Sequence, residues 1–369
     1  MREWLAADYG ANTRLVAPGQ EETHVATSTS KPDKKKLDAV HKEFERLALR
    51  GYWQNRREAK PLEPHLWRWA DVHPVLMQAA DAVAIGNGEE GTTFRRNIGA
   101  GVPGQELGSV SMGYQVVMPG ETAAVHHHTA TAMRFGVIGN GTYTTANEER
   151  MMIEPGGLLV QPNWAWHGHG NLTDEPTIWL DILNVGLVNF LHAQFREEWA
   201  EGDQPITKPD GFSVQRYQAL RPPTALGDPD PPAFSYGWAE TIAALEAADD
   251  AGEDDAYDGV LLDYTNPVTG GPTTVSIQAQ VQMLRPGEET KPHRHTGSTR
   301  HHVVRGKGVT TVGKDRETEL AWSEKDLFYV PPWSWHQHRN ESSTDPAILF
   351  SVNDYPLLKS LGMHREELG

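Results

Sequence analysis

The sequence predicts an all-β protein built from two related domains in tandem, and three observations support this prediction. Short stretches of alternating apolar residues, separated by turns such as Pro-Gly and Gly-Asn-Gly, begin at Met112 and again near Thr274. The length of 369 residues exceeds what one hydrophobic core of typical size needs. Both stretches also carry the same motifs in the same order, so we interpret them as a duplicated unit.

The first 75 residues are predicted to form an arm and a helix. Residues 1–35 are rich in Ser, Thr, Gly and charge and show little periodicity, which favours a mobile arm or an extension that wraps around another subunit. Apolar residues then recur at helical spacing from Leu37 to Leu47 and predict an amphipathic helix. We place the first barrel at residues 76–200.

The connection between the barrels is predicted from a Pro- and Asp-rich stretch at 202–232, where no periodicity survives. One helix is expected after it, at 238–248, followed by an acidic turn. We therefore place the linker with its helix at residues 201–265 and the second barrel at residues 266–369.

The composition excludes several classes of function. Because the chain has no Cys, a metal must be held by His, Asp, Glu or backbone oxygen. A net charge of -17 argues against nucleic acid and anionic membranes as partners, and we interpret the basic run at 31–36 as solvated. No stretch approaches the roughly 18 apolar residues of a spanning helix, and the start lacks a secretory signal. We predict a cytoplasmic protein whose 17 histidines are its most informative residues.

A histidine pair and a distant third histidine occur in each half of the chain. Both pairs follow Pro-Gly-Glu, and both single histidines end a Trp-x-Trp-His run. The histidines are, in order, His126, His128 and His167 in the first half and His293, His295 and His336 in the second. Corresponding histidines lie 167 residues apart at the first position and 169 at the third, as a duplication requires.

The spacing of the histidines indicates a metal site. Residues two apart on a strand point to the same side, so His126 and His128 project together, and His167 arrives from a later strand. Three neutral imidazoles leave positions open on a six-coordinate ion, which suits iron(II) binding both a substrate and O2. A single histidine is more often an ordinary polar residue near a barrel mouth, but a duplicated set is not. We predict iron(II) on these three residues.

These motifs resemble the two conserved motifs of the cupin family. The matching positions are Gly120, His126, His128, Arg134 and Gly141 for the first motif and Gly156, Pro162, His167 and Asn171 for the second. The resemblance implies two β-barrels of jelly-roll type, each with a metal at its centre.

One position departs from most cupins, which carry a Glu ligand where this chain has Arg134. A guanidinium cannot ligate a metal, but it can bind an anionic substrate. A buried cation without a carboxylate partner would be costly, so Arg134 is expected to serve the substrate. Its replacement should then leave folding unchanged. A surface position on the strand is the alternative.

Arg134, the run Trp-x-Trp-His-Gly-His-Gly-Asn and the later Trp-Leu-Asp make the chain similar to the bicupin ring-cleaving dioxygenases that act on gentisate, salicylate and 1-hydroxy-2-naphthoate. The resemblance places the iron ligands on His126, His128 and His167. It places the remaining site residues on Arg134, Arg95 (preferred to its neighbour Arg96), Gln115, His169 and Asp181. His169 is expected to hydrogen-bond a phenolate or bound oxygen, with Asp181 orienting it. Gln115 and Asp181 as ordinary strand-end hydrogen bonders remain an alternative.

The family resemblance also implies a reaction, an extradiol-type cleavage by O2 between the carboxyl- and hydroxyl-bearing carbons of a small aromatic acid, and a homotetramer. Gentisate members tend to carry a His and a Tyr where this chain has Asn97 and Ser111. These differences favour a salicylate without the 5-hydroxyl, or one differently substituted there.

The second barrel is predicted to differ from the first in its ligands. His301 occupies the position equivalent to Arg134, so a metal held by four histidines with a structural role is expected, without a cation for substrate. Two alternatives remain for the whole chain. A manganese bicupin decarboxylase or oxidase of small acids would keep the Glu ligand, and a non-enzymatic bicupin binding protein would not need two complete histidine sets.

Overall fold

The structure is a computed structural model that describes residues 34–47, 62–85, 92–93, 96–101, 108–200, 204–217 and 232–369. The chain divides into two compact units, Met1–Ala59 and Lys60–Gly369. In the first unit the described residues form helix α1 (Lys34–Arg46), which confirms the predicted amphipathic helix. The predicted arm lies outside the described residues except at its end. No helix within these ranges combines the length and apolar character needed to cross a membrane.

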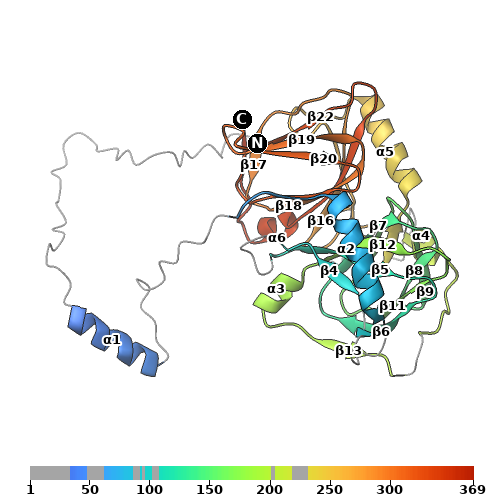
Figure 1. Ribbon diagram of the computed structural model, residues 1–369, viewed down its shortest axis with the longest axis horizontal. Coiled ribbons are helices and arrows are strands. Elements are labelled where there is room, and N and C mark those ends of the chain that lie inside the picture. The colour runs from blue at the N-terminus through green and yellow to red at the C-terminus, as the bar shows by residue number, and fades with distance from the viewer. Residues whose placement is uncertain are drawn as a thin grey trace. The chain divides into compact units, whose positions relative to one another are not determined.

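The second unit contains two barrels, each made of a six-stranded and a five-stranded antiparallel sheet (Figure 1). The six-stranded sheet of the N-terminal barrel has the order β14 (Phe234–Tyr236), β10 (Leu158–Gln161), β7 (Ala132–Ile138), β12 (Thr177–Leu183), β5 (Ser111–Val117), β4 (Asn97–Gly99). Its five-stranded sheet has the order β13 (Arg196–Glu198), β6 (Thr122–His128), β11 (His167–Asn171), β8 (Thr142–Ala146), β9 (Glu149–Ile153).

The C-terminal barrel repeats this arrangement. Its six-stranded sheet has the order β1 (His65–Trp67), β21 (Leu327–Val330), β18 (Thr299–Arg305), β23 (Ala347–Asn353), β16 (Gln278–Leu284), β15 (Val260–Asp263). Its five-stranded sheet has the order β20 (Thr318–Ser323), β19 (Lys307–Val312), β22 (His336–Asn340), β17 (His293–His295), β24 (Glu366–Leu368). Strands β2 (Ala84–Ile85) and β3 (Thr92–Thr93) form a small parallel pair. The predicted tandem of β-barrels is confirmed.

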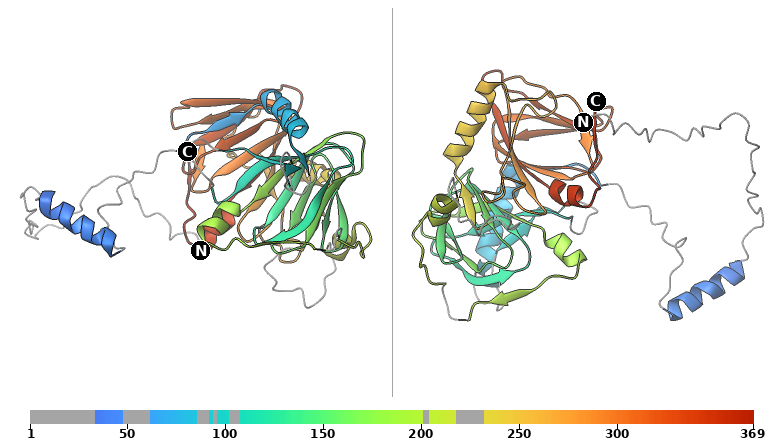
Figure 2. Two further views of the ribbon diagram at one scale, coloured as in Figure 1. Left: turned by 60° about the horizontal axis from the view of Figure 1, so that its bottom comes forward. Right: turned by 180° about the vertical axis from the view of Figure 1, so that it is seen from behind.

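The two six-stranded sheets share one hydrophobic core, so the barrels lie against each other in both views of Figure 2. Phe135 on β7 stacks on Phe350 on β23, with ring centroids 3.9 Å apart. Met133 belongs to the same core, while Arg134 between them is on the opposite face of the strand. Strand β7 is thus buried on both faces, and its polar face lines the interior of its own barrel.

The strand that precedes each barrel pairs with the other barrel. Strand β1 precedes the N-terminal barrel but pairs with β21, and β14 precedes the C-terminal barrel but pairs with β10. A helix follows each after one residue, α2 (Trp69–Ala82) and α5 (Trp238–Ala251). The amide of Trp69 donates to Asp326 and that of Trp238 donates to Glu154, at 2.7 and 2.8 Å. The duplicated unit therefore includes a strand and a helix, and the two copies exchange their first strands.

Several helices differ from the sequence-based expectation. Helix α5 confirms the helix expected at 238–248 and extends to Ala251. Helix α2, which contains Pro74, was not predicted. The other unpredicted helices in the described part of the chain, six residues each, are α3 (Val185–Phe190), α4 (Phe212–Tyr217) and α6 (Tyr355–Ser360). Segments this short carry fewer than two turns of periodic pattern. The limits proposed at residues 75, 200 and 265 stay predictions.

Candidate active site

Three buried histidines converge inside the N-terminal barrel. One ring nitrogen of each lies within 4.8 Å of those of the other two, for His126 and His128 on β6 and His167 on β11. Strands β6 and β11 are neighbours, with His126 opposite His167 in the register. The structure thus brings together the three residues that the sequence predicted as ligands.

Each of these rings is oriented by a backbone carbonyl, at 2.8 to 2.9 Å from its Nδ1 atom. The pairs are His126 with Ala124, His128 with Ala130 and His167 with Ala165. A carbonyl only accepts, so Nδ1 carries the proton and Nε2 keeps the lone pair that a metal needs. Burial lowers the pKa of His167 well below its usual range, which keeps the ring neutral.

The residues present fit a divalent transition metal. Nε2 of His167 is buried and has no hydrogen-bond partner among the described residues. A buried polar nitrogen of this kind is costly without a partner, and a metal ion satisfies it. Three neutral imidazoles leave further coordination positions open.

Arg134 lies beside this group, 2% exposed, on the interior face of β7. Its Nη1 donates to Oε1 of Gln161 at 2.6 Å, and its Nη2 donates to Nε2 of His169 at 3.2 Å. Its Nε lies 3.7 Å from Oδ1 of Asp181, which is opposite Arg134 in the register of β7 and β12. The expectation that Arg134 would lack a carboxylate partner was wrong, because the sheet register places Asp181 next to it.

The ring of His169 is oriented by Thr144. A guanidinium can only donate, so Nε2 of His169 accepts from Arg134 and the ring proton is on Nδ1. That Nδ1 donates to Oγ1 of Thr144 at 2.8 Å. The sequence had assigned this role to Asp181, which is linked to His169 through Arg134 and accepts from Asn97 at 2.6 Å.

Of the two arginines that precede strand β4, Arg95 and Arg96, the structure describes Arg96. Arg96 is buried and makes a double ion pair with Glu121, with its Nη2 2.8 Å from Oε1. It also donates to the carbonyl of Val83. Gly120 has φ +74°, a conformation that favours glycine, so Arg96 and Gly120 both maintain the Pro-Gly-Glu turn before β6. Arg95, the preferred substrate residue, lies outside the described residues.

Gln115 is buried on β5, on the face of the strand that points into the barrel. It is opposite Trp179, a neighbour of Asp181 on β12. Its Nε2 has no hydrogen-bond partner within the described part of the chain. A buried amide in this state is suited to a ligand or a water molecule.

A stacked cluster next to the ligands was not found from the sequence. The ring of His127 lies between Trp166 and Trp164, with centroid distances of 3.7 and 4.0 Å. Its Nε2 lies 2.9 Å from Oε2 of Glu197 on β13. Because His127 is between two predicted ligands, this cluster fixes the strand that carries them.

The C-terminal barrel has the same cluster with a different central residue. Arg294 lies over the rings of Trp333 and Trp335, at 4.4 and 4.8 Å, and pairs with Glu367. The repeated Trp-x-Trp run was the sequence signal for it. In the C-terminal barrel a planar, permanently charged guanidinium thus takes the place of the imidazole of His127.

The second histidine group consists of His293, His295 and His336, again with one ring nitrogen each within 4.8 Å of the others. His301, expected as a fourth ligand, is not a member of this group. Its ring stacks on Phe328, with centroids 4.5 Å apart and an interplanar angle of 10°. The second group therefore has three members.

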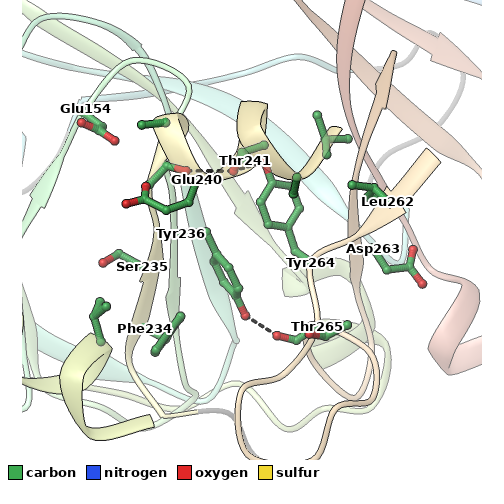
Figure 3. Close-up of a pocket in the computed structure, with 15 residues that line it drawn as sticks. Glu154, Phe234, Ser235, Tyr236, Glu240, Thr241, Leu262, Asp263, Tyr264 and Thr265 are labelled. Carbon is green, nitrogen blue, oxygen red and sulfur yellow. Dashed lines mark hydrogen bonds between the residues drawn. The ribbon is translucent and has the colours of Figure 1, made fainter. Parts of the chain in front are cut away.

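A pocket of about 630 Å³ is lined by residues of strand β14, helix α5 and strand β15 (Figure 3). Two of its tyrosines are engaged by other residues of the lining, since Tyr236 donates to the carbonyl of Thr265 and Tyr264 donates to Thr241. None of the predicted site residues that the structure describes lines it. The chemistry indicated by the sequence lies inside the barrels instead.

Two such barrels, each with a histidine group, define a metal-binding bicupin. Both barrels match the Cupin domain family, at residues 113–183 and 280–353. A 5-aminosalicylate 1,2-dioxygenase from Comamonas is 37% identical over 90% of both chains. A 1-hydroxy-2-naphthoate 1,2-dioxygenase from Nocardioides is 36% identical, covering 82% of this chain and 78% of the relative.

Solved structures agree with this assignment. A salicylate 1,2-dioxygenase from Pseudoaminobacter salicylatoxidans, in an adduct with gentisate, aligns with a TM-score of 0.82 at 27% identity, covering 92% of this chain and 96% of the other. The chain belongs to the bicupin family of ring-cleaving 1,2-dioxygenases that includes the gentisate, salicylate and 1-hydroxy-2-naphthoate enzymes. It is a dioxygenase, which removes the decarboxylase and binding-protein alternatives.

Proposed function

We propose that the N-terminal barrel binds iron(II) through His126, His128 and His167 and uses O2 to open the ring of a salicylate-like acid. Cleavage falls between the carbons that bear the carboxyl and hydroxyl groups. The observation that carries the proposal is the buried histidine group beside the hydrogen-bonded Arg134 and His169. Iron(II), when bound, supplies open positions for the chelating acid and activates O2.

The side chains around the metal group have separate roles in this proposal. Arg134 receives the substrate carboxylate, and Gln161 and Asp181 hold its guanidinium in place. In the structure Arg134 also donates to Nε2 of His169. A substrate carboxylate competes for that guanidinium, and His169 then accepts the phenol proton while Thr144 holds the other nitrogen.

Two further residues complete the proposed substrate site. Arg95 binds the carboxylate together with Arg134, since Arg96 is engaged by Glu121. The unpartnered amide of Gln115 donates to an oxygen of the substrate.

The substrate we propose is a salicylate that carries, at position 5, hydrogen or a group other than hydroxyl. The relative that is 37% identical is named for 5-aminosalicylate. Asn97 stands where gentisate enzymes tend to carry a His, and its amide is engaged by Asp181. Gentisate and 1-hydroxy-2-naphthoate are the alternative substrates. Specificity constants for salicylate, 5-aminosalicylate, gentisate and 1-hydroxy-2-naphthoate, measured under one set of conditions, decide between them.

The reaction is tested by following the oxygen atoms. The ring supplies all the electrons that O2 accepts, so no NADH, reductase or 2-oxoglutarate is needed and both oxygen atoms enter the ring-opened oxo-diacid. Protein reconstituted anaerobically with iron(II) is mixed with the acid and isotopically labelled O2. Mass spectrometry then counts the labelled oxygen atoms in the product. One labelled atom, or a requirement for an external reductant, contradicts the proposal. So does full activity with manganese alone.

We also propose a homotetramer in the cytoplasm. Large apolar side chains are exposed at equivalent places, just after helix α3 and just after helix α6, with Leu191 60% and Leu361 58% exposed. Exposed apolar surface of this kind favours self-association. Size-exclusion chromatography with light scattering measures the mass of the assembly, and a monomer would contradict the proposal.

A further inference from the structure

We propose that Trp179 belongs to the substrate site of the N-terminal barrel, where its indole N–H and the side-chain amide of Gln115 donate hydrogen bonds to the hydroxyl oxygen of the aromatic acid. The two donors favour the phenolate, which forms when His169 accepts the phenol proton. This inference rests on the proposed function and extends it, because it adds a residue to the site and names the oxygen that the donors bind.

Trp179 and Gln115 each have a buried donor without an acceptor. Both side chains are 1% exposed. Neither Nε1 of Trp179 nor Nε2 of Gln115 has a hydrogen-bond partner in the part of the chain that the structure describes. A buried N–H group in this state costs free energy, so such groups are rare in native proteins. Two of them in one barrel indicate an acceptor that comes from outside the chain.

The two donors are neighbours on the interior face of the barrel. Gln115 on β5 lies opposite Trp179 on β12 in the register, and opposite residues of an antiparallel pair share one face. The residues next to them, Tyr114 and Leu180, belong to the core between the barrels, so the two donor side chains point inward. The ring centroid of Trp179 is 5.6 Å from that of His169. The donors therefore lie beside the residue proposed to accept the phenol proton.

The acid offers two polar groups, a carboxylate and a hydroxyl. In the proposed function Arg134 binds the carboxylate, and His169 takes the proton of the hydroxyl. That proton moves from oxygen to Nε2 of His169 while its electron pair stays on oxygen, so the oxygen becomes negative. Neutral N–H donors in apolar surroundings stabilise such a charge, and Val117 and Leu159 belong to the same buried cluster as Trp179. Both donors thus lower the pKa of the bound phenol.

The C-terminal barrel provides an internal comparison, because its corresponding amide is engaged by the protein. Gln282 is the fifth residue of β16, as Gln115 is of β5. Its Nε2 donates to the carbonyl of Asp258 at 2.7 Å. The residue opposite it in the register is Leu349, whose side chain has no donor, where the N-terminal barrel has Trp179. At this pair of positions the second barrel therefore has no open donor.

A buried indole of the C-terminal barrel is engaged as well. Trp322 on β20 is 1% exposed, and its Nε1 donates to Oγ1 of Thr310 at 2.9 Å. Thr310 bonds Nδ1 of His338 at 2.8 Å, as Thr144 bonds Nδ1 of His169. The protein can thus satisfy an indole next to this threonine–histidine pair. In the N-terminal barrel the indole beside the equivalent pair has no such partner among the residues described.

The first test measures the pKa of a bound phenol and needs no turnover. The probe is 5-nitrosalicylate, whose phenolate is coloured, bound to full-length protein loaded with zinc(II), which is colourless and has no redox chemistry. The absorbance is titrated against pH. In Trp179→Phe, which keeps an aromatic ring and loses the N–H, the pKa of the bound phenol is expected to rise by about one, because a hydrogen bond to a charged oxygen is lost. An unchanged pKa overturns the proposal.

Trp322→Phe is the matched control, since it removes an indole N–H of equal burial from the other barrel. It should leave the pKa of the bound phenol at the wild-type value, and an equal rise in both variants would count against the proposal. Gln115→Leu removes the second donor and should raise the pKa in the same direction, so the proposal is also tested if Trp179→Phe fails to fold. No rise in Gln115→Leu would overturn the pairing of the two donors.

Activity separates this inference from the proposed function. With iron(II), Trp179→Phe should lower kcat about 100-fold and leave the metal content unchanged, because a donor to a developing charge is lost. A wild-type kcat in this variant overturns the inference. Absence of ring-opened product from the wild type, with a phenol pKa that still depends on Trp179, would contradict the proposed reaction and support the donor pair. A wild type that binds no aromatic acid would contradict both.

Discussion

Arg134 and Asp181 face each other inside the N-terminal barrel, with Nε of the arginine 3.7 Å from Oδ1 of the aspartate. The two residues are 2% and 4% exposed. The same guanidinium donates to His169, so one cation is shared between a carboxylate of the protein and the residue proposed to accept the phenol proton. A change at Arg134 therefore affects both stability and substrate binding.

Arg134→Met is expected to raise the KM for the acid about tenfold or more, because a charge-assisted hydrogen bond to its carboxylate is lost. It should also destabilise the protein by about 3 kcal/mol, because Asp181 is left buried and uncompensated. This revises the sequence-based expectation of unchanged folding. Steady-state kinetics and thermal unfolding measure the two effects.

The double variant Arg134→Met with Asp181→Asn is the control for this prediction. Removing both charges should restore much of the melting temperature and leave the KM high. A wild-type KM in either variant would show that Arg134 does not bind the substrate.

His167→Ala is expected to lose the metal of the N-terminal barrel and all ring cleavage, because two imidazoles remain at the centre of the site. Metal analysis and O2 uptake measure both. His169→Ala is the matched control, since it should keep the metal and lose activity. Ring cleavage by iron-free His167→Ala would contradict the assignment of His167 as a metal ligand.

Thr144→Val is expected to lower kcat by about 10- to 100-fold while the metal stays bound, because the proton on Nδ1 of His169 loses its acceptor. Thr144→Ser keeps the hydroxyl and should restore most of the rate. The pH profile of kcat should also change in Thr144→Val and not in Thr144→Ser. An unchanged rate and profile in Thr144→Val would mean that Thr144 does not position His169.

His127→Arg and His127→Ala test the stacked cluster beside the ligands. Arginine occupies this position between the two tryptophans of the C-terminal barrel, so His127→Arg should keep the metal affinity near that of the wild type. His127→Ala removes the stacking and the contact with Glu197, and its affinity should fall about 10- to 100-fold. Metal titration of both proteins measures this. Equal affinities in the two variants would leave the cluster without a role in metal binding.

The sequence by itself determined that the protein is a duplicated β-barrel with a histidine metal group. Ligation needs particular residue types, and period-two spacing on a strand is a local property, so His126 and His128 could be read directly. The exchange of the first strands could not be predicted in this way. His65 pairs with Tyr329, which is far from it in the sequence, and no local pattern records such a pairing.

Only the tertiary structure decided the partners of the residues around the metal. Arg134, Gln161 and Asp181 come from three strands, and their contacts depend on sheet register. A shift of one residue in that register would turn each side chain to the opposite face. For the same reason Thr144, which orients His169, and Phe328, which stacks on His301, were found in the fold and not in the sequence.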